Sequence, residues 1–203
     1  MTDFAELLAA AGRLADAGPR QILGITGPPG AGKSTLAERL VAGLGPERAV
    51  LVGMDGFHLA DAELRRTGRR SRKGAPDTFD RAGYAALLAR LRREPGTVYA
   101  PAFDRSVEDS VTAAVPVPAG VPLVVTEGNY LLLWPEIRPL LDEVWYLDPP
   151  ADARRAALVA RHVAYGKAPD QAERWVAESD ERNAELIAAG RQLADRVLGW
   201  PAG

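Results

Sequence analysis

The chain contains no cysteine, which excludes disulfide bonds, thiolate zinc sites and a cysteine nucleophile. It carries little net charge, −2 from 25 basic and 27 acidic side chains, so bulk electrostatics favour neither nucleic acid nor a membrane surface as a partner. It lacks any uninterrupted apolar run near the roughly 18 residues of a transmembrane helix. The first stretch, MTDFAELLAAAGRLADAG, has acids early and no basic segment of the kind that begins a signal peptide. We therefore expect a cytoplasmic protein.

What is present is typical of a globular domain, with 47% apolar and 26% charged residues among 203. This length suits a single α/β domain over residues 1–203, and no internal repeat or linker divides it. Buried apolar runs predict strands at 20–26, 48–54, 121–128, 142–148 and 195–200. Helical periodicity predicts helices at 3–16, 33–44, 81–93, 134–141, 151–165 and 170–189.

Strands that alternate with helices predict a parallel sheet with helices on both faces. Ligands of such folds collect beyond the carboxyl ends of the strands. Two stretches do not fit the core pattern: a loop over 55–80 with a short helix in it, and a proline-broken β-excursion over about 97–118.

A glycine-rich turn follows the first predicted strand and fits the pattern G-x-x-x-x-G-K-[ST]. Its glycines let successive backbone N–H groups point at anionic oxygens, and the following helix adds a partial positive charge. Lys33 is placed to bridge β- and γ-phosphates, and the Ser34 hydroxyl to complete a Mg²⁺ shell. The predicted nucleotide-binding residues are Gly27, Pro28, Pro29, Gly30, Ala31, Gly32, Lys33, Ser34 and Thr35.

This turn alone does not define the reaction, because ATPases, GTPases and kinases share it. Asp55 follows the second strand, where a carboxylate can accept the proton of an attacking hydroxyl or contact a metal-bound water. The competing interpretation makes Asp55 a turn former before Gly56. His58 is either a ligand of a substrate oxygen or a structural histidine. Glu127 ends a core strand, where it suits the metal shell or is simply an exposed acid, and Asn129 is a candidate for orienting a substrate hydroxyl.

Five segments occur in order: GPPGAGKS, MDGFHL, RKGAPDTFD, PAFDRSVEDSV and TEGNYLLL. Together they resemble the superfamily of uridine kinase, phosphoribulokinase and bacterial pantothenate kinase, over about residues 20 to 190. The similarity is greatest to a bacterial nucleoside/nucleotide kinase-like group, some members of which are linked with fructose transport. The resemblance implies the phosphate-loop NTPase fold, a three-layer αβα sandwich with a helical lid. It also implies transfer of phosphate from ATP, with Mg²⁺, to a small-molecule alcohol.

By the same resemblance, Asp55 matches the catalytic base, Lys73 a basic position that approaches the reacting groups, and Glu127 the metal-side acid. A lid over about 151–170 is implied as well. Arg154 and Arg161 are seven residues apart and share a helical face, so both are candidates for closing on the triphosphate and stabilising the transition state. Exposed helix ion pairs are the alternative for both.

The remaining candidates lie on the acceptor side. Arg72 and Lys73 would neutralise the transferred phosphate or hold an anionic group of the substrate, whereas the other arginines of 65–74 suit a solvated loop. Phe103 could stack on a ring and Asp104 could bind sugar hydroxyls, but packing and an ion pair explain them equally well. Asn183 is either a satisfied core amide or a substrate contact.

The sequence therefore favours a metabolite kinase. An ATPase or switch protein in a regulatory or transport complex is the alternative, and a degenerate nucleotide-binding module is a third class. A nucleoside, a sugar and a pantothenate-like alcohol remain open as acceptors, and ATP over GTP rests on the resemblance alone. The pattern is compatible with a homodimer, and no residue decides the oligomeric state.

Overall fold

Five parallel strands form the central sheet of the computed structural model, which describes residues 3–199. Their order is β2-β5-β1-β6-β7, with β1 (Gln21–Thr26), β2 (Ala49–Gly53), β5 (Leu123–Glu127), β6 (Glu143–Leu147) and β7 (Arg196–Leu198). The inner strands are buried on both faces, which explains their nearly continuous apolar sequences. The strand predictions are thus confirmed, except that Trp200, the last residue of the predicted final strand, lies outside the described residues.

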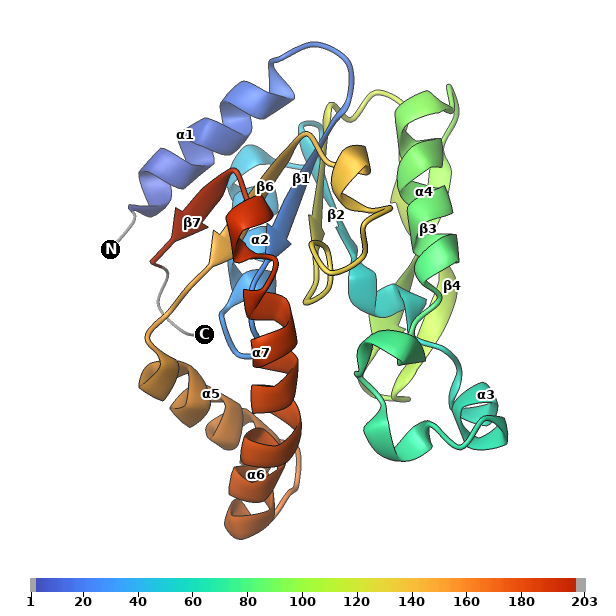
Figure 1. Ribbon diagram of the computed structural model, residues 1–203. Helices are drawn as coiled ribbons and strands as arrows, with labels where there is room; N and C mark the ends of the chain where they lie inside the picture. The colour runs from blue at the N-terminus through green and yellow to red at the C-terminus, as the bar shows by residue number, and fades with distance from the viewer. Residues whose placement is uncertain (1–2, 200–203) are drawn as a thin grey trace.

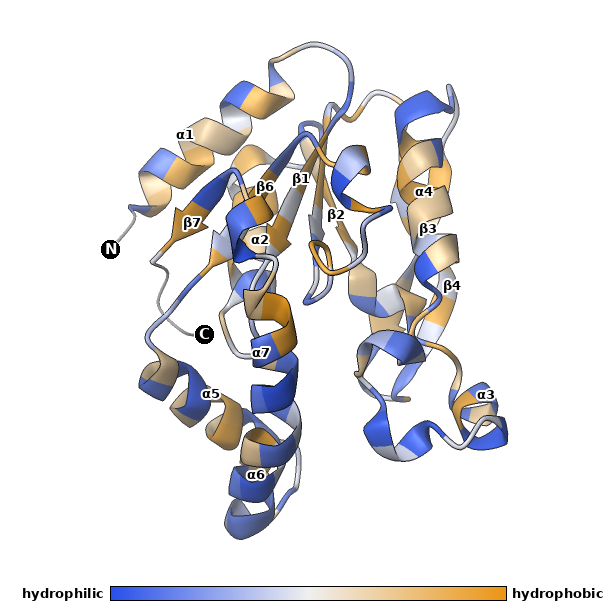
Figure 2. Ribbon diagram, in the orientation of Figure 1, coloured by the Kyte–Doolittle hydropathy of each residue, from blue (hydrophilic) through white to orange (hydrophobic). Residues whose placement is uncertain are grey.

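Helices cover both faces of this sheet, which confirms the three-layer α/β prediction (Figure 1). Side chains of β6 alternate between two hydrophobic clusters: Val144 contributes to one and Trp145 to the other. The helices α1 (Phe4–Ala15) and α2 (Lys33–Leu44) pack with the Trp145 cluster, and α4 (Arg81–Arg93) packs with the Val144 cluster. Figure 2 shows the apolar residues concentrated on the strands between these helices. None of the described helices is long and apolar enough to cross a bilayer.

The predicted β-excursion is an antiparallel hairpin outside the main sheet, made of β3 (Val98–Asp104) and β4 (Asp109–Val117). It lies against the 3-10 turn η1 (Met54–Phe57) that follows β2. At this contact a Cβ on Gly56 would be 2.5 Å from the backbone oxygen of Pro101, so only glycine allows the approach. The helix α3 (Asp61–Arg66) and two 3-10 turns, Arg70–Arg72 and Pro76–Thr78, complete the segment between β2 and α4.

Two helix predictions need correction. The only regular helix in the stretch 134–141 is a 3-10 turn at Arg138–Leu140, because Pro139 lacks the N–H that it would donate to residue 135 in a longer α-helix. The predicted helix 170–189 is interrupted: α6 (Pro169–Trp175) and α7 (Glu181–Ala188) flank a π-helical turn, Val176–Asp180. The preceding helix α5 (Ala151–Ala164) agrees with its prediction. Figure 1 shows α5 and α6 beyond the carboxyl edge of the sheet, opposite α3.

Candidate active site

The glycine-rich turn joins β1 to α2 at the carboxyl edge of the sheet. Gly27 adopts a φ of 148°, and a Cβ there would be 2.5 Å from the backbone oxygen of Leu147. Gly32 has a φ of 82° and is the residue before α2, which begins at Lys33. Both positions favour glycine because L residues rarely adopt such angles, and at Gly27 a side chain would also clash with β6.

The side chain of Lys33, the first residue of α2, points back into the glycine-rich turn. Its Nζ donates to the backbone oxygens of Gly27 (3.0 Å) and Pro28 (2.9 Å), and the residue is only 8% exposed. Burial lowers the pKa of Lys33 to about 8, although the nearby Glu127 carboxylate opposes the shift. Triphosphate oxygens entering the loop could replace these carbonyls as partners of the ammonium and favour its charged form.

Ser34 and Glu127 meet beside this lysine. The Ser34 Oγ donates to Glu127 Oε1 at 3.1 Å, and Glu127 is the last residue of the buried strand β5. Burial, helped by the charge of Asp55, raises the pKa of Glu127 to about 7. Among residues 3–199 no group of three or more His, Asp or Glu side chains could hold a metal ion. One hydroxyl and one carboxylate nevertheless fit Mg²⁺, which keeps several waters and binds phosphates in addition to one or two protein oxygens.

Asp55 lies in η1, two residues beyond Gly53, the last residue of the neighbouring strand β2. Its side chain is 40% exposed, and Oδ2 is 3.8 Å from Nη2 of Arg105. His58 donates from Nδ1 to the backbone oxygen of Asp55 at 2.8 Å, which leaves Nε2 as an acceptor when the ring is neutral. Burial lowers the pKa of His58, so the neutral form is favoured.

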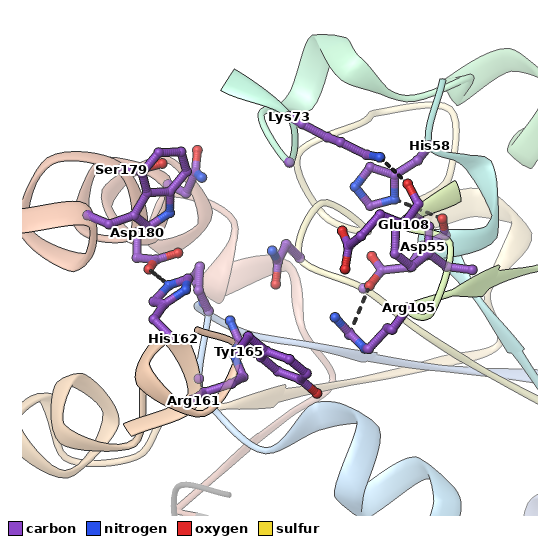
Figure 3. A pocket seen from close by; sticks show the side chains of 18 of the residues that line it. Asp55, His58, Lys73, Arg105, Glu108, Arg161, His162, Tyr165, Ser179 and Asp180 are labelled. Atoms are coloured by element: carbon purple, nitrogen blue, oxygen red, sulfur yellow. Dashed lines mark hydrogen bonds and ion pairs between the residues drawn. The ribbon is translucent and has the colours of Figure 1, made fainter. Parts of the chain in front are cut away.

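One cavity of about 800 Å³ contains these groups. Figure 3 shows Asp55, His58, Lys73 and Arg105 on one side, facing His162 and Asp180 on the other. Of the predicted site residues, the following line it: Pro29, Gly30, Lys33, Ser34, Asp55, His58, Lys73, Phe103, Glu127, Asn129 and Arg161. Asn183 lines it as well. Gly32 and Thr35 line an adjoining hollow of about 280 Å³ between α2 and α5, to which Arg161 also contributes.

Other predicted residues do not line the large cavity in the part of the chain that the structure describes. Gly27, Pro28 and Ala31 are buried in the turn itself. Arg72 forms an exposed ion pair with Asp77. Asp104 accepts hydrogen bonds from the backbone N and Oγ of Ser106, which closes the tip of the hairpin. Arg154 is buried below the cavity, against Pro29 and Glu181.

Lys73 links three segments around the cavity. Its Nζ is 2.9 Å from Oδ1 of Asp61 on α3 and donates to the backbone oxygen of Glu108 at the hairpin tip. The same ammonium lies 5.2 Å from the ring centre of Phe103. Glu108 itself has a φ of 54°, an uncommon angle for a residue with a side chain. Lys73 therefore holds the acceptor-side segments together at the cavity wall.

Several cavity residues have no assigned role in the sequence pattern. Arg105 stands in the PAFDRS segment, and its proximity to Asp55 appears only in the folded chain. His162 is expected to point away from the face of Arg161, yet it lines the cavity, with Nε2 2.8 Å from Oδ2 of Asp180. The π-helical turn supplies Ser179 and Asp180 to the cavity wall opposite Asp55. Such a turn can be recognised only from coordinates, because its sequence also fits an α-helix.

A parallel sheet whose carboxyl edge carries a glycine-rich phosphate turn, with acids where two adjacent strands end, defines a phosphate-loop nucleotide-binding protein. The chain is 32% identical to a "putative uridine kinase" of Schizosaccharomyces pombe over 177 residues, which are 81% of this chain and 74% of that protein. A solved structure titled "putative fructose transport system kinase", from Silicibacter sp. TM1040, is 34% identical with a TM-score of 0.88, covering 98% of this chain and 100% of that one. The chain belongs to the superfamily of P-loop kinases that includes uridine kinase, pantothenate kinase and phosphoribulokinase. It is therefore a phosphotransferase that uses a nucleotide.

Two further matches cover different lengths of this chain. An "ATP-dependent kinase-like protein notR'" of Aspergillus versicolor is 36% identical over 152 residues, 68% of this chain and 88% of that protein. The family model described as methylmalonyl Co-A mutase-associated GTPase MeaB matches residues 4–54. That range holds the phosphate turn and ends before Asp55, so it carries no information on the acceptor side of the cavity.

Proposed function

We propose that this protein transfers the γ-phosphate of ATP to a hydroxyl group of a small metabolite. The observation that carries the proposal is that the Asp55 carboxylate lines the same cavity as Lys33 and Ser34. A free hydroxyl can therefore lie between a proton acceptor and a bound triphosphate. Similarity to proteins named as ATP-dependent and uridine kinases favours ATP and an alcohol acceptor.

In this reaction the hydroxyl proton passes to Asp55 as the hydroxyl oxygen forms a bond with the γ-phosphorus. The bond from that phosphorus to the β,γ-bridging oxygen breaks, and ADP leaves. Lys33 and Arg161 face the triphosphate and stabilise the charge on its oxygens. Ser34 and Glu127 would hold Mg²⁺, which neutralises phosphate charge when bound. The protein thus contributes positioning and electrostatics, with no covalent intermediate.

The acceptor side of the cavity supports an organic substrate over water alone. Phe103 and His58 lie with ring centres 4.9 Å apart and form an apolar surface beside Asp55. Asn129 and Ser179 add polar groups that can accept or donate to hydroxyls. An ATPase or switch protein needs no such wall. It remains the alternative function, favoured if nucleotide turnover proceeds at full rate with water.

The experiment is an ATP-consumption assay against nucleosides, sugars and pantothenate-like alcohols, with each compound added separately. We expect slow turnover without a metabolite and strong stimulation by at least one compound class. Replacing Asp55 by Asn should lower the stimulated kcat by about 10²–10⁴-fold, because general base catalysis typically contributes that much. ATP binding should persist in this variant.

The matched control is Asp16→Asn, since Asp16 is an exposed aspartate that pairs with Arg48 on the opposite side of the fold. It should keep the wild-type rate. Unchanged turnover in the Asp55→Asn variant would remove Asp55 from the reaction. Full turnover without any metabolite would instead support the ATPase.

A further inference from the structure

Arg154 has surroundings unlike those of a phosphate ligand. It is 4% exposed, and its Nη1 donates to the backbone oxygen of Pro29 at 3.3 Å. Its Nη2 donates to Glu181, the first residue of α7. Glu181 also accepts a hydrogen bond from Nε of Arg155 at 3.0 Å, so one carboxylate holds two arginines of α5. The guanidinium therefore ties α5 both to α7 and to the phosphate turn.

The phosphate turn is in direct contact with α5 at this point. Gly30 has a φ of 79°, and a Cβ on it would lie 2.6 Å from Cγ of Leu158 and 3.1 Å from the backbone oxygen of Arg154. The backbone of the turn therefore packs directly against the Leu158 side chain and the backbone of Arg154. A shift of α5 relative to the sheet would consequently move the turn as well.

The hydrogen bond to Pro29 has a consequence for phosphate recognition. In a trans peptide the C=O and the N–H point in opposite directions, and none of the described peptides is cis. A Pro29 oxygen that points at Arg154 thus directs the N–H of Gly30 away from α5. Pro29 and Gly30 both line the cavity, where inward N–H groups bind anionic oxygens.

Arg161 provides the contrast on the same helix. It lies two helical turns beyond Arg154, about 10 Å along the axis, and it lines both the large cavity and the adjoining hollow. The two arginines share a face of α5 but have different neighbours. Only the second is exposed to an incoming triphosphate.

The geometry points to Arg154 as a positioning residue: together with Glu181 it fixes the Pro29–Gly30 peptide so that the Gly30 N–H faces the phosphates. Arg154 does not itself contact the nucleotide. This inference deepens the proposed function, but it rests only on nucleotide binding by the phosphate turn and not on the acceptor. Its test therefore needs no acceptor. The inference can fail while the proposed phosphate transfer to an alcohol holds, and the reverse is equally possible.

The decisive variant is Glu181→Gln, with ADP and ATP dissociation constants measured by calorimetry. If Arg154 acts through the turn, loss of its carboxylate partner weakens nucleotide binding by about tenfold, since small misplacements in a site are costly. Arg154→Ala should weaken it in the same direction. If Arg154 binds the triphosphate directly, Glu181→Gln releases the guanidinium and leaves binding unchanged or tighter. That result would overturn the inference.

Arg155→Ala is the matched control. Arg155 shares Glu181 but is half-exposed and has no contact with Pro29 among the hydrogen bonds of the described residues. We expect its nucleotide affinity to stay within about twofold of wild type, as for other exposed ion pairs. Arg154→Lys keeps the charge but loses the planar fork, and should bind nucleotide as weakly as Arg154→Ala. Wild-type nucleotide affinity in Arg154→Lys would indicate that residue 154 acts only as a positive charge near the phosphates, which would contradict the inference.

Hydrogen exchange of the nucleotide-free protein separates a local effect from unfolding. Arg154→Ala should speed exchange at the amides of 27–34 while β1 and β5 keep their protection, and Arg161→Ala should leave 27–34 unchanged. Equal exchange of 27–34 in wild type and Arg154→Ala would contradict the inference even if nucleotide affinity fell.

Discussion

At the scale of single residues, three ionisable groups of the site, Lys33, Glu127 and Asp55, determine the pKa values of the two that are buried. Lys33 and Glu127 are both buried, and each opposes the shift that burial imposes on the pKa of the other. Asp55 adds a second negative charge, which raises the pKa of Glu127 further and that of Lys33 as well. Before nucleotide enters, burial therefore brings the pKa values of both groups toward neutrality, to about 8 for Lys33 and about 7 for Glu127.

The raised pKa of Glu127 predicts that the stability of the metal-free, nucleotide-free protein depends on pH. The pKa of Glu127 is about 7 in the folded state, whereas it has the ordinary glutamate value of 4.5 in the unfolded chain. The folded state therefore binds more protons between these values, and the free energy of unfolding falls as pH rises from about 5 to 7. Burial of His58 lowers its pKa and gives a slope of the opposite sign in part of this range.

Comparison with Glu127→Gln isolates the glutamate, because Gln keeps an oxygen for Ser34 and does not titrate. Between pH 5 and 7.5 the stability of wild type relative to this variant should fall by an amount on the order of 2 kcal/mol, measured by urea unfolding. Parallel pH profiles for the two proteins would show that folding does not shift the pKa of Glu127.

The sequence predicts the site residues that belong to the turn pattern or stand at the ends of predicted strands. Lys33 and Ser34 follow from the turn pattern, and Asp55 and Glu127 from their positions after strands of one parallel sheet. Arg105 and His162 come from segments whose approach depends on how the hairpin and α5–α7 pack on that sheet, which no local pattern encodes. Arg154 shows the same limit: helical spacing places it on the face of Arg161 but does not reveal that Pro29 and Glu181 cover it.

At the scale of elements, the contact between η1 and the β3–β4 hairpin sets the position of Asp55. Gly56→Ala would bring a methyl group to 2.5 Å from the backbone oxygen of Pro101, where neither backbone segment can easily move. We expect a loss of about 1–3 kcal/mol of stability, as for other overpacked contacts, and a lower kcat because Asp55 shifts with its turn. Thermal unfolding and the stimulated assay measure both effects.

Gly96→Ala is the control for this substitution, since a Cβ there meets no atom within 4 Å. It should leave stability and rate nearly unchanged. A fully stable and active Gly56→Ala protein would mean that the hairpin adjusts freely and does not position Asp55.

The inner strands β1, β5 and β6 are predicted well because the burial of nearly all their residues makes each a short, largely apolar run. The errors lie in helices. The 134–141 stretch has apolar spacing typical of a helix, but Pro139 in its interior limits it to a 3-10 turn. The π-helical turn at 176–180 cannot be predicted by period, because five residues do not distinguish one helical repeat from another.

At the scale of the whole molecule, the two hydrophobic clusters lie on opposite faces of one sheet and contain alternate residues of the same strands. Neither cluster can lose its packing without exposing the strands of the other. We therefore expect a single cooperative thermal transition, with a van't Hoff enthalpy equal to the calorimetric enthalpy. An early separate transition would show that α5–α7 or the hairpin segment unfolds independently.

The two sides of the cavity come from different stretches of the chain. The phosphate turn and α5 form one side, whereas residues 55–109, from the part of the chain that joins β2 to β5, form much of the other. The preference for one acceptor over another can therefore change through substitution of this one continuous segment, while the phosphate turn and α5 stay the same. A chimaera that carries residues 55–117 of a relative with a known acceptor, and thus the whole β3–β4 hairpin, should acquire that relative's preference and keep its own nucleotide affinity.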